Sequence, residues 1–384
     1  MASVLIFSSS SRGAHASAAD ALAQTLRDEH GVAVTVADLH SFLTPLERWF
    51  YRRGQFLFLN VTAQPASALV RAAQRSSSLA ALARARYPFA SSAVRALVTR
   101  VQPSVIVATH PLGAMIMGRF GLRWRRPLFF LPVNYEAHRF QVHPTVTTYG
   151  VPHELVAADL RRLGVSPEAI AITGMPLDAA FDTLPSPADA RRALGLPERV
   201  PVVVVSQGAV GSGPWTIPLV VSLWRALPAE THILVITGHN TATARVLTTL
   251  PLPPRVRCVG FVRNFHEYLR AADVLIGKAG GMSATSAFIA GTPLVIFSPN
   301  ALEVGSARRF SATGAALTAD GSVVRAVSLT ARLLASPEKR RMLTEAASRF
   351  VVHGGRQRFA NMVFSTLVPV AVQTAGSRAL PVVR

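Results

Sequence analysis

The sequence predicts an α/β protein built from two doubly wound, Rossmann-like parallel-sheet domains. Short runs rich in Val and Ile alternate with helix-like stretches along almost the whole chain. Continuous apolar runs of this kind are typical of parallel strands that are buried on both faces. The alternation occurs once in each half of the 384 residues, and a single ordinary core rarely exceeds about 250–300 residues. Two α/β domains therefore follow from pattern and length together.

The expected elements can be placed along the chain by these patterns. In the first half, the predicted strands are residues 4–7, 32–38, 104–109, 128–133 and 169–173, with helices at 16–29 and 153–163. In the second half, they are residues 201–206, 232–237, 256–259, 274–276 and 294–297, with helices at 214–227, 265–271, 283–290 and 302–312. Three prolines and scattered charges between them predict a linker over residues 181–200. The domains would then cover residues 1–180 and 201–350, and a helix and tail, 351–384, would pack back on the first domain.

Composition restricts the function classes. The formal net charge is +20, and Lys278 and Lys339 are the only lysines, so arginine supplies nearly all the positive charge. Arginine suits phosphates and anionic lipid headgroups, and it would equally suit nucleic acid. Cys258 is the only cysteine, which excludes an internal disulfide and disfavours a cysteine metal site, as expected in a reducing compartment. The first residues are read as a strand and not as a signal peptide, and no apolar run reaches the length of a membrane span.

Two segments interrupt the regular pattern with aromatic, leucine and arginine residues side by side. They are residues 42–59 and 119–130. Such mixtures suit a membrane interface, where rings lie at headgroup level and arginine meets phosphate. The alternative is a helix packed on the first domain with solvated arginines. Both interpretations stay open for residues 42–59, whereas the strand that follows favours the packed alternative for residues 119–130.

Residues 260–299 carry the strongest sign of chemistry. A strand at 274–276 leads through Lys278, Gly280 and Gly281 directly into a predicted helix. Glycines let the backbone approach a ligand closely, and a helix start offers unpaired N–H groups to a phosphate. Lys278 would add a positive charge. The segment therefore predicts a phosphate-binding loop, although strand–glycine–helix turns also occur in α/β domains that bind nothing there.

The wider sequence resembles a known family. Residues 273–296 (DVLIGKAGGMSATSAFIAGTPLVI) resemble the donor-site signature of the monogalactosyldiacylglycerol synthase and processive diacylglycerol glucosyltransferase family, with the peptidoglycan N-acetylglucosaminyltransferase as a more distant relative. Further segments follow in family order. They are residues 12–22 (RGAHASAADAL), 108–111 (ATHP), 134–144 (NYEAHRFQVHP), 149–152 (YGVP), 172–177 (ITGMPL) and 260–262 (GFV). The match covers most of residues 3–316.

This resemblance implies a GT-B architecture, in which two facing Rossmann-like domains bind the acceptor and a UDP-sugar respectively. It implies an inverting, metal-independent transfer of a hexose that needs no cofactor besides the UDP-sugar donor. It places the main chain of Val262 at the uracil and Gly280, Gly281, Met282 and Ser283 at the diphosphate, with Lys278 beside them. It also places Ser206, Gln207 and Gly208 in a loop facing the cleft, Ser286 at the ribose, and Glu303 and Ser306 near the sugar.

His15 is the candidate general base in this comparison. An inverting transfer must remove a proton from the acceptor hydroxyl, and a histidine of near-neutral pKa suits that task. A lone histidine at a helix start is otherwise commonly a polar surface residue. For His110 and His138, a structural or surface role is favoured over a role beside the acceptor.

The chain also departs from the family pattern. Arg12 and Ala14 stand where the family loop has glycines, and Asn134 stands where relatives carry Asp. Ser286 replaces a glutamate that binds both ribose hydroxyls. The Gln-Glu pair expected near the sugar is shortened to Leu302-Glu303, which leaves half of that clamp.

The leading hypothesis is a cytoplasmic enzyme on the inner face of the cell membrane. It would move a hexose from a UDP-sugar to a lipid acceptor, with diacylglycerol as the expected lipid and an anionic membrane surface as partner. The alternatives are a polyprenyl-linked or other hydrophobic acceptor, and a non-catalytic nucleotide or lipid sensor. No nucleic-acid partner is expected, because the arginines are dispersed and no recognised nucleic-acid motif is present.

Overall fold

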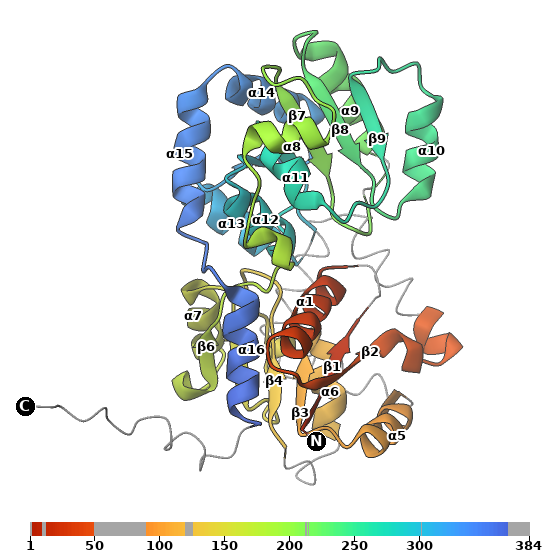
Figure 1. The fold of residues 1–384 in the computed structure, drawn as a ribbon, viewed down its shortest axis with the longest axis vertical. Coiled ribbons are helices and arrows are strands. Elements are labelled where there is room, and N and C mark those ends of the chain that lie inside the picture. Colours follow the sequence, from red (N-terminus) through yellow and green to blue (C-terminus); the bar gives the residue numbers. More distant parts are fainter. Residues whose placement is uncertain are drawn as a thin grey trace, which may run out of the picture.

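The computed structural model describes residues 2–9, 13–49, 90–119, 126–211, 213, 215–300 and 302–367. Within these residues the chain forms two α/β domains, one above the other in Figure 1, and each contains a parallel sheet. The two-domain α/β prediction is confirmed. Arg12, residues 50–59 and 120–125 of the two interrupting segments, and the tail beyond Leu367 lie outside the described residues.

The first domain is built on a sheet whose strands run in the order β2-β1-β3-β4-β5-β6. All its described pairings are parallel. The strands are β1 (Ser3–Ser8), β2 (Ala33–Asp38), β3 (Val105–Ala108), β4 (Leu128–Phe130), β5 (Thr148–Val151) and β6 (Ile170–Ile172). The helices and 3-10 turns are α1 (Ala14–Asp28), η1 (Leu39–Phe42), α5 (Ala90–Val101), α6 (Pro111–Arg119), η3 (Arg139–Gln141), α7 (Glu154–Arg162), η4 (Pro167–Ala169) and η5 (Ala179–Phe181).

The second domain repeats the design with strand order β12-β11-β10-β7-β8-β9, again parallel throughout the described pairings. Its strands are β7 (Val202–Ser206), β8 (His232–Ile236), β9 (Val256–Val259), β10 (Val274–Gly277), β11 (Leu294–Ile296) and β12 (Leu317–Thr318). Its helices are α8 (Pro187–Ala193), α9 (Thr216–Ala226), α10 (Thr241–Thr249), α11 (Phe265–Ala271), α12 (Gly281–Ala290), α13 (Val304–Ala312), α14 (Val323–Leu334) and α15 (Pro337–Ser348).

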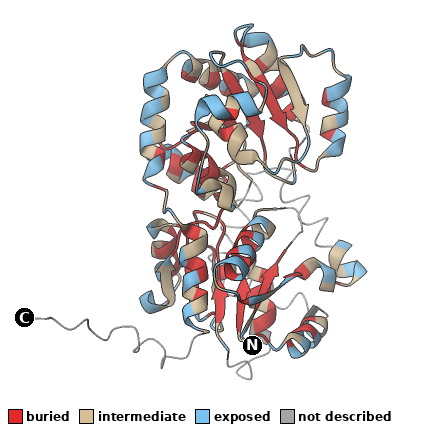
Figure 2. Cartoon of the chain, viewed as in Figure 1, coloured by how far each residue is buried: buried red, intermediate tan, exposed pale blue. Residues whose placement is uncertain are grey.

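Each central strand is apolar on consecutive positions because helices cover both faces of its sheet. Val4, Leu5, Ile6 and Phe7 of β1 are all fully buried, and so are the valines of β7. Figure 2 shows the buried residues concentrated on the strands and on the inner faces of the helices. This arrangement explains why the strands could be located from continuous Val/Ile runs.

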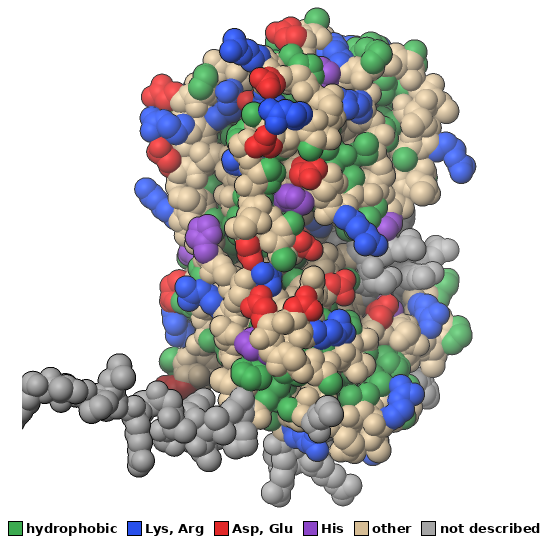
Figure 3. All heavy atoms as spheres, in the orientation of Figure 1, with side chains coloured by type: hydrophobic (Ala, Val, Ile, Leu, Met, Phe, Trp, Pro, Cys, Tyr) green, Lys and Arg blue, Asp and Glu red, His purple; other side chains and the backbone are tan. Residues whose placement is uncertain are grey.

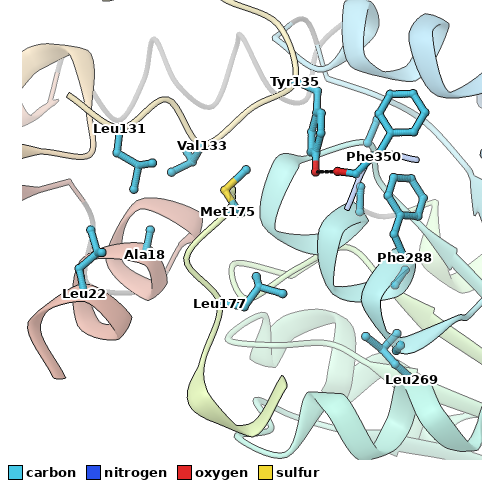
Figure 4. Close-up of a cluster of buried hydrophobic side chains, with 14 of the residues drawn as sticks. Ala18, Leu22, Leu131, Val133, Tyr135, Met175, Leu177, Leu269, Phe288 and Phe350 are labelled. Atoms are coloured by element: carbon cyan, nitrogen blue, oxygen red, sulfur yellow. Dashed lines mark hydrogen bonds between the residues drawn. The ribbon is translucent and has the colours of Figure 1, made fainter. Parts of the chain in front are cut away.

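A third part of the core joins the two domains. The cluster drawn in Figure 4 takes Ala18 and Leu22 from α1, Met175 from the first crossing between domains, and Phe288 from α12. Tyr135 lies fully buried beside it, and its hydroxyl bonds to Thr285 Oγ1 at 2.9 Å and donates to the Phe350 carbonyl oxygen at 3.1 Å. Because apolar packing and hydrogen bonds both cross the boundary, the structure holds the domains in one defined arrangement.

The chain returns to the first domain through α16 (Gly355–Ser365), which lies beside α1 (Figure 1). A Cβ at Gly150 of β5 would lie only 2.3 Å from the Phe359 ring, so this strand needs a glycine to let α16 approach. Arg356 adds ion pairs to Glu29 and Asp182. The helix thus packs on the first domain through both apolar and charged contacts.

The stretch read as a linker, residues 181–200, contains helix α8. Ser186 caps its N-terminus by accepting the Asp189 N–H at 3.1 Å, and Pro187 stands in its first turn, where its missing N–H costs nothing. Arg191 of α8 then pairs with Asp273 at 3.0 Å and so attaches the helix to the second domain. The prolines and charges of this stretch serve helix capping and docking.

Candidate functional site

The predicted phosphate-binding loop lies where several turns of the second domain meet at the carboxyl edge of its sheet. Ser206 ends β7, Gln207 and Gly208 follow it, and Lys278 follows β10. A Cβ on Gly208, whose φ is +82°, would lie 3.0 Å from Lys278 Cε and 3.7 Å from Ser283 Oγ. The loop after β7 and the turn into α12 therefore face one another across a gap that only glycine leaves open.

Helix α12 begins at this gap, and its N-cap residue has no side chain to cap the helix. Gly280 is its N-cap, in extended conformation and with no side-chain cap, and Gly281 begins the helix. The first N–H groups of a helix have no partner within it, so they attract an anion. Met282 and Ser283, in the same turn, are half-buried, whereas Ser286 is 5% exposed, on the buried side of the helix. Gly280 to Ser283 therefore form the candidate anion-binding turn, and Ser286 brings no charge to it.

Lys278 is fixed beside this turn by a carboxylate. Its Nζ lies 3.3 Å from Glu303 Oε1, and the side chain of Glu303 is only 5% exposed. A Cβ at Gly280 would lie 2.8 Å from the same Glu303 oxygen. Glu303, expected near the sugar, is therefore engaged in holding the one lysine of the loop. The pair leaves the ammonium, 27% exposed, at the edge of the gap.

The turn after β9 completes this edge. Val262 is half-buried and packs against the core. Its neighbour Phe261 is 50% exposed, and the Phe261 ring stacks on His239 with centroids 4.5 Å apart. The pairing of these rings was not predicted from the sequence. The Gly260-Phe261-Val262 motif identified the turn. His239 belongs to the loop after β8, and its nearness to Phe261 becomes visible only in the folded chain.

His15 lies in the first domain, in the first turn of α1. Its Nδ1 lies 2.5 Å from the Thr109 carbonyl oxygen, which can only accept, so Nδ1 carries the proton and Nε2 keeps its lone pair. Burial lowers the pKa of His15 to about 4, with smaller lowering contributions from the charge of Lys278 and from His40, while the Thr109 carbonyl acts in the opposite direction. A near-neutral pKa was expected for a general base at this position. The structure instead keeps His15 neutral through the whole physiological range.

Two further histidines surround His15. The ring of His110 meets that of His15 edge to face, with centroids 4.7 Å apart, and its Nδ1 accepts the Leu112 N–H at 3.1 Å. Burial, and then His15 and His40, lower the pKa of His110 well below its usual value. The favoured structural role of His110 stays a prediction, but the residue forms one side of the His15 environment. The charge of Lys278, on the second domain, contributes to lowering the pKa of His15, on the first domain. The loop that carries Lys278 therefore lies near His15.

His138 lies elsewhere, buried in the contact between the domains. It is 5% exposed, and its ring bonds to the Leu302 backbone. Burial lowers its pKa, against raising contributions from Glu136 and Asp159. Asn134 of the same loop directs Oδ1 to the Gly281 N–H at 3.5 Å, at the start of α12. Asn134, which stands where relatives carry Asp, thus contacts the anion-binding turn.

Parts of this chain are similar in sequence to known proteins. Residues 15–177 match the family model described as Monogalactosyldiacylglycerol (MGDG) synthase. The chain is 26% identical over 207 residues to the processive diacylglycerol beta-glucosyltransferase of Bacillus pumilus, covering 53% of each protein. It is 30% identical over 210 residues to a probable chloroplastic monogalactosyldiacylglycerol synthase of Nicotiana tabacum, covering 51% of this chain and 39% of the relative.

The chain is similar to monogalactosyldiacylglycerol synthases and to processive diacylglycerol glucosyltransferases over about half of its length. The resemblance predicted from its motifs is confirmed. The matched part spans about half the length, or less, of the curated relatives. Activity, substrates and partners are therefore inferred below from the site and the relatives together.

Solved structures share the fold of this chain. The Staphylococcus aureus MnaA structure with UDP has a TM-score of 0.65 at 11% identity and covers 96% of this chain and 98% of its own. The glycosyltransferase of kitacinnamycin has a TM-score of 0.62 at 15% identity, covering 96% and 99%. Both likenesses extend across the two domains, and the predicted GT-B architecture is confirmed.

Proposed function

We propose that this protein transfers a hexose from a UDP-sugar to diacylglycerol. One observation carries the proposal: an anion-binding turn with Lys278 on one domain faces a neutral histidine, His15, on the other. Relatives are named as diacylglycerol glucosyltransferase and as monogalactosyldiacylglycerol synthase. The cleft would hold donor and acceptor together, which removes much of the entropic cost of the reaction.

The chemistry assigned to the cleft is a single displacement with inversion. The acceptor hydroxyl oxygen forms a bond to the anomeric carbon while His15 Nε2 takes the hydroxyl proton. The bond between that carbon and the diphosphate oxygen breaks, and its electron pair leaves with UDP. Lys278 and the N–H groups of Met282 and Ser283 would stabilise the growing negative charge. With these groups in that role, we infer a transfer that requires no metal ion.

Membrane association is the second part of the proposal. On the helical turn after η1, Leu46 is 66% exposed and Trp49 is 51% exposed. Glu47 and Arg48 between them are half-buried, and Arg48 donates to the Leu43 carbonyl oxygen at 3.1 Å. Apolar and aromatic side chains beside arginine suit the lipid headgroup region. Figure 3 shows Lys and Arg side chains spread over both domains on the face drawn. We infer that the protein works from the cytoplasm, at an anionic inner membrane face. No described helix has the length and apolar character needed to cross a bilayer.

The decisive experiment is a UDP-release screen. Several UDP-sugars would be offered with diacylglycerol in anionic liposomes, and the products would be separated by thin-layer chromatography. The proposal expects UDP release that requires both substrates and persists in EDTA. Release with a polyprenyl-linked acceptor alone would replace the acceptor assignment. UDP binding without release for any acceptor would replace the enzyme with a nucleotide or lipid sensor, and release that stops in EDTA would contradict metal independence.

A further inference from the structure

A loop of the first domain lies across the starts of two helices of the second. The Val133 carbonyl oxygen lies 2.1 Å from where a Cβ of Gly281 would stand, at the start of α12. Two residues beyond Asn134, the Glu136 carboxylate reaches the first turn of α13, where a Cβ on Gly305 would lie 1.7 Å from Oε2. The loop therefore borders the anion-binding turn on one side and brings a carboxylate to the neighbouring helix on the other.

The close approach of Glu136 depends on a glycine in the first turn of a helix. Gly305 is the second residue of α13. A side chain of any size at this position would occupy the space that the Glu136 carboxylate takes. The sequence thus has a residue without a side chain at the position where the carboxylate of the first domain meets the second domain.

Glu136 also differs from the other carboxylates nearby. Glu303 is engaged with Lys278, and Asp159 is held by Arg309 at 2.7 Å and by the Ala137 N–H at 3.0 Å. The Glu136 side chain is half-buried, its charge acts to raise the pKa of His138, and it makes no hydrogen bond or salt bridge with any described residue. A half-buried carboxylate without such partners keeps its acceptor sites available for hydroxyl groups.

We propose that Glu136 binds hydroxyl groups of the transferred hexose, so that the acceptor domain takes part in recognising the donor sugar. The inference rests on the proposed function and deepens it. A sugar joined to a diphosphate at the α12 turn must lie beside that turn, and the loop from Asn134 to Glu136 borders it. Carboxylates accept strong hydrogen bonds from hydroxyls. Sugar recognition would then depend on how closely the two domains approach.

The test separates the sugar from the nucleotide. Titration calorimetry would measure the Kd of UDP, UDP-glucose and UDP-galactose for the wild type, Glu136→Gln and Glu136→Ala. The proposal expects the Kd of the preferred UDP-hexose to rise about tenfold or more in both variants, while that of UDP changes less than about twofold. Glu168→Gln, at an exposed site of the same domain, is the control and should match the wild type.

A double-mutant comparison keeps the test independent of folding defects. Gly305→Ala should weaken UDP-hexose binding in the wild type by displacing the carboxylate, and should have little further effect in Glu136→Ala, where the obstruction is gone. Equal losses for UDP and UDP-hexose, or no loss, would overturn the inference. So would an altered pH profile of kcat with unchanged KM, which would indicate a proton-transfer role. A wild type that binds UDP but no UDP-hexose would instead refute the proposed function.

Discussion

At the scale of single residues, the site depends on keeping His15 neutral and oriented. The Thr109 carbonyl fixes which nitrogen carries the proton, and burial with the nearby Lys278 charge opposes protonation of the other. A pKa of about 4 makes His15 a weak base in the resting protein. It can still accept a proton late in the displacement, because the acceptor oxygen becomes strongly acidic as its bond to the sugar forms.

His15→Ala is expected to reduce transfer by about 10²–10⁴-fold, the usual contribution of general-base catalysis, while leaving UDP binding unchanged. In the wild type, activity should fall only as the pH approaches 4, because protonation of His15 begins there. UDP-release rates between pH 4 and 8 would check both points, with exposed His353→Ala as the matched control. Full activity in His15→Ala, or an acid limb centred near 6.5, would contradict the assignment.

The lowered pKa of His15 should also make the stability of the protein depend on pH. The folded pKa of His15 lies below its usual 6.5, so below about 6.5 the unfolded chain binds a proton that the folded chain refuses. The contribution of His15 to stability is therefore complete above pH 6.5 and lost as the pH falls toward 4. His110 should act in the same direction. Melting temperatures measured from pH 7.5 to 4.5 should fall less steeply for His15→Ala than for the wild type, and parallel curves would contradict this view.

At the scale of elements, the sequence predicted most of the sheets and part of the site. The strands rich in Val and Ile were located because parallel sheets bury both faces. The strand β5 was missed because Thr148-Tyr-Gly-Val carries a glycine that only its contact with Phe359 explains. The turn from Gly280 to Ser283 could likewise be predicted from the local strand–glycine–helix pattern. The positions of Glu136 and His239 could not, because they depend on contacts between segments that are distant in the sequence.

The start of α12 packs so closely against the first domain that a side chain at Gly281 should disturb the site. Gly281→Ala would place a methyl group 2.1 Å from the Val133 carbonyl oxygen, so the two domains must separate slightly. Transfer should then fall about tenfold or more, because small misplacements of reacting groups are costly. The control is Glu168→Gln, at an exposed site of the first domain outside the candidate site. Steady-state rates and UDP-induced shifts in Tm would be measured, and equal behaviour of the two variants would refute the steric explanation.

At the scale of the whole molecule, the two domains share a core centred on Tyr135. Its ring contacts those of Phe310 and Phe350, with centroids 5.1 and 5.9 Å apart. Tyr135→Phe keeps this packing but removes a buried hydroxyl that bonds across the domain boundary. We expect the unfolding free energy to fall by about 1–2 kcal/mol, seen as a lower Tm, and Tyr268→Phe, at a half-buried site, to have a smaller effect. A Tm unchanged by Tyr135→Phe would show that the hydroxyl does not hold the domains together.

Membrane binding also belongs to the whole molecule, since it combines the net charge of +20 with one exposed apolar turn. Sedimentation with anionic vesicles should recover most of the protein at low salt and less at 0.5 M salt, by roughly tenfold, because salt screens the charge. Leu46→Ser with Trp49→Ser should lower binding further at either salt, because two side chains that are 66% and 51% exposed would no longer enter the headgroup region. Val324→Ser, at a residue 79% exposed on α14 of the other domain, is the control. If Val324→Ser lowers binding as much as the double variant does, the turn bearing Leu46 and Trp49 is not the membrane-facing surface.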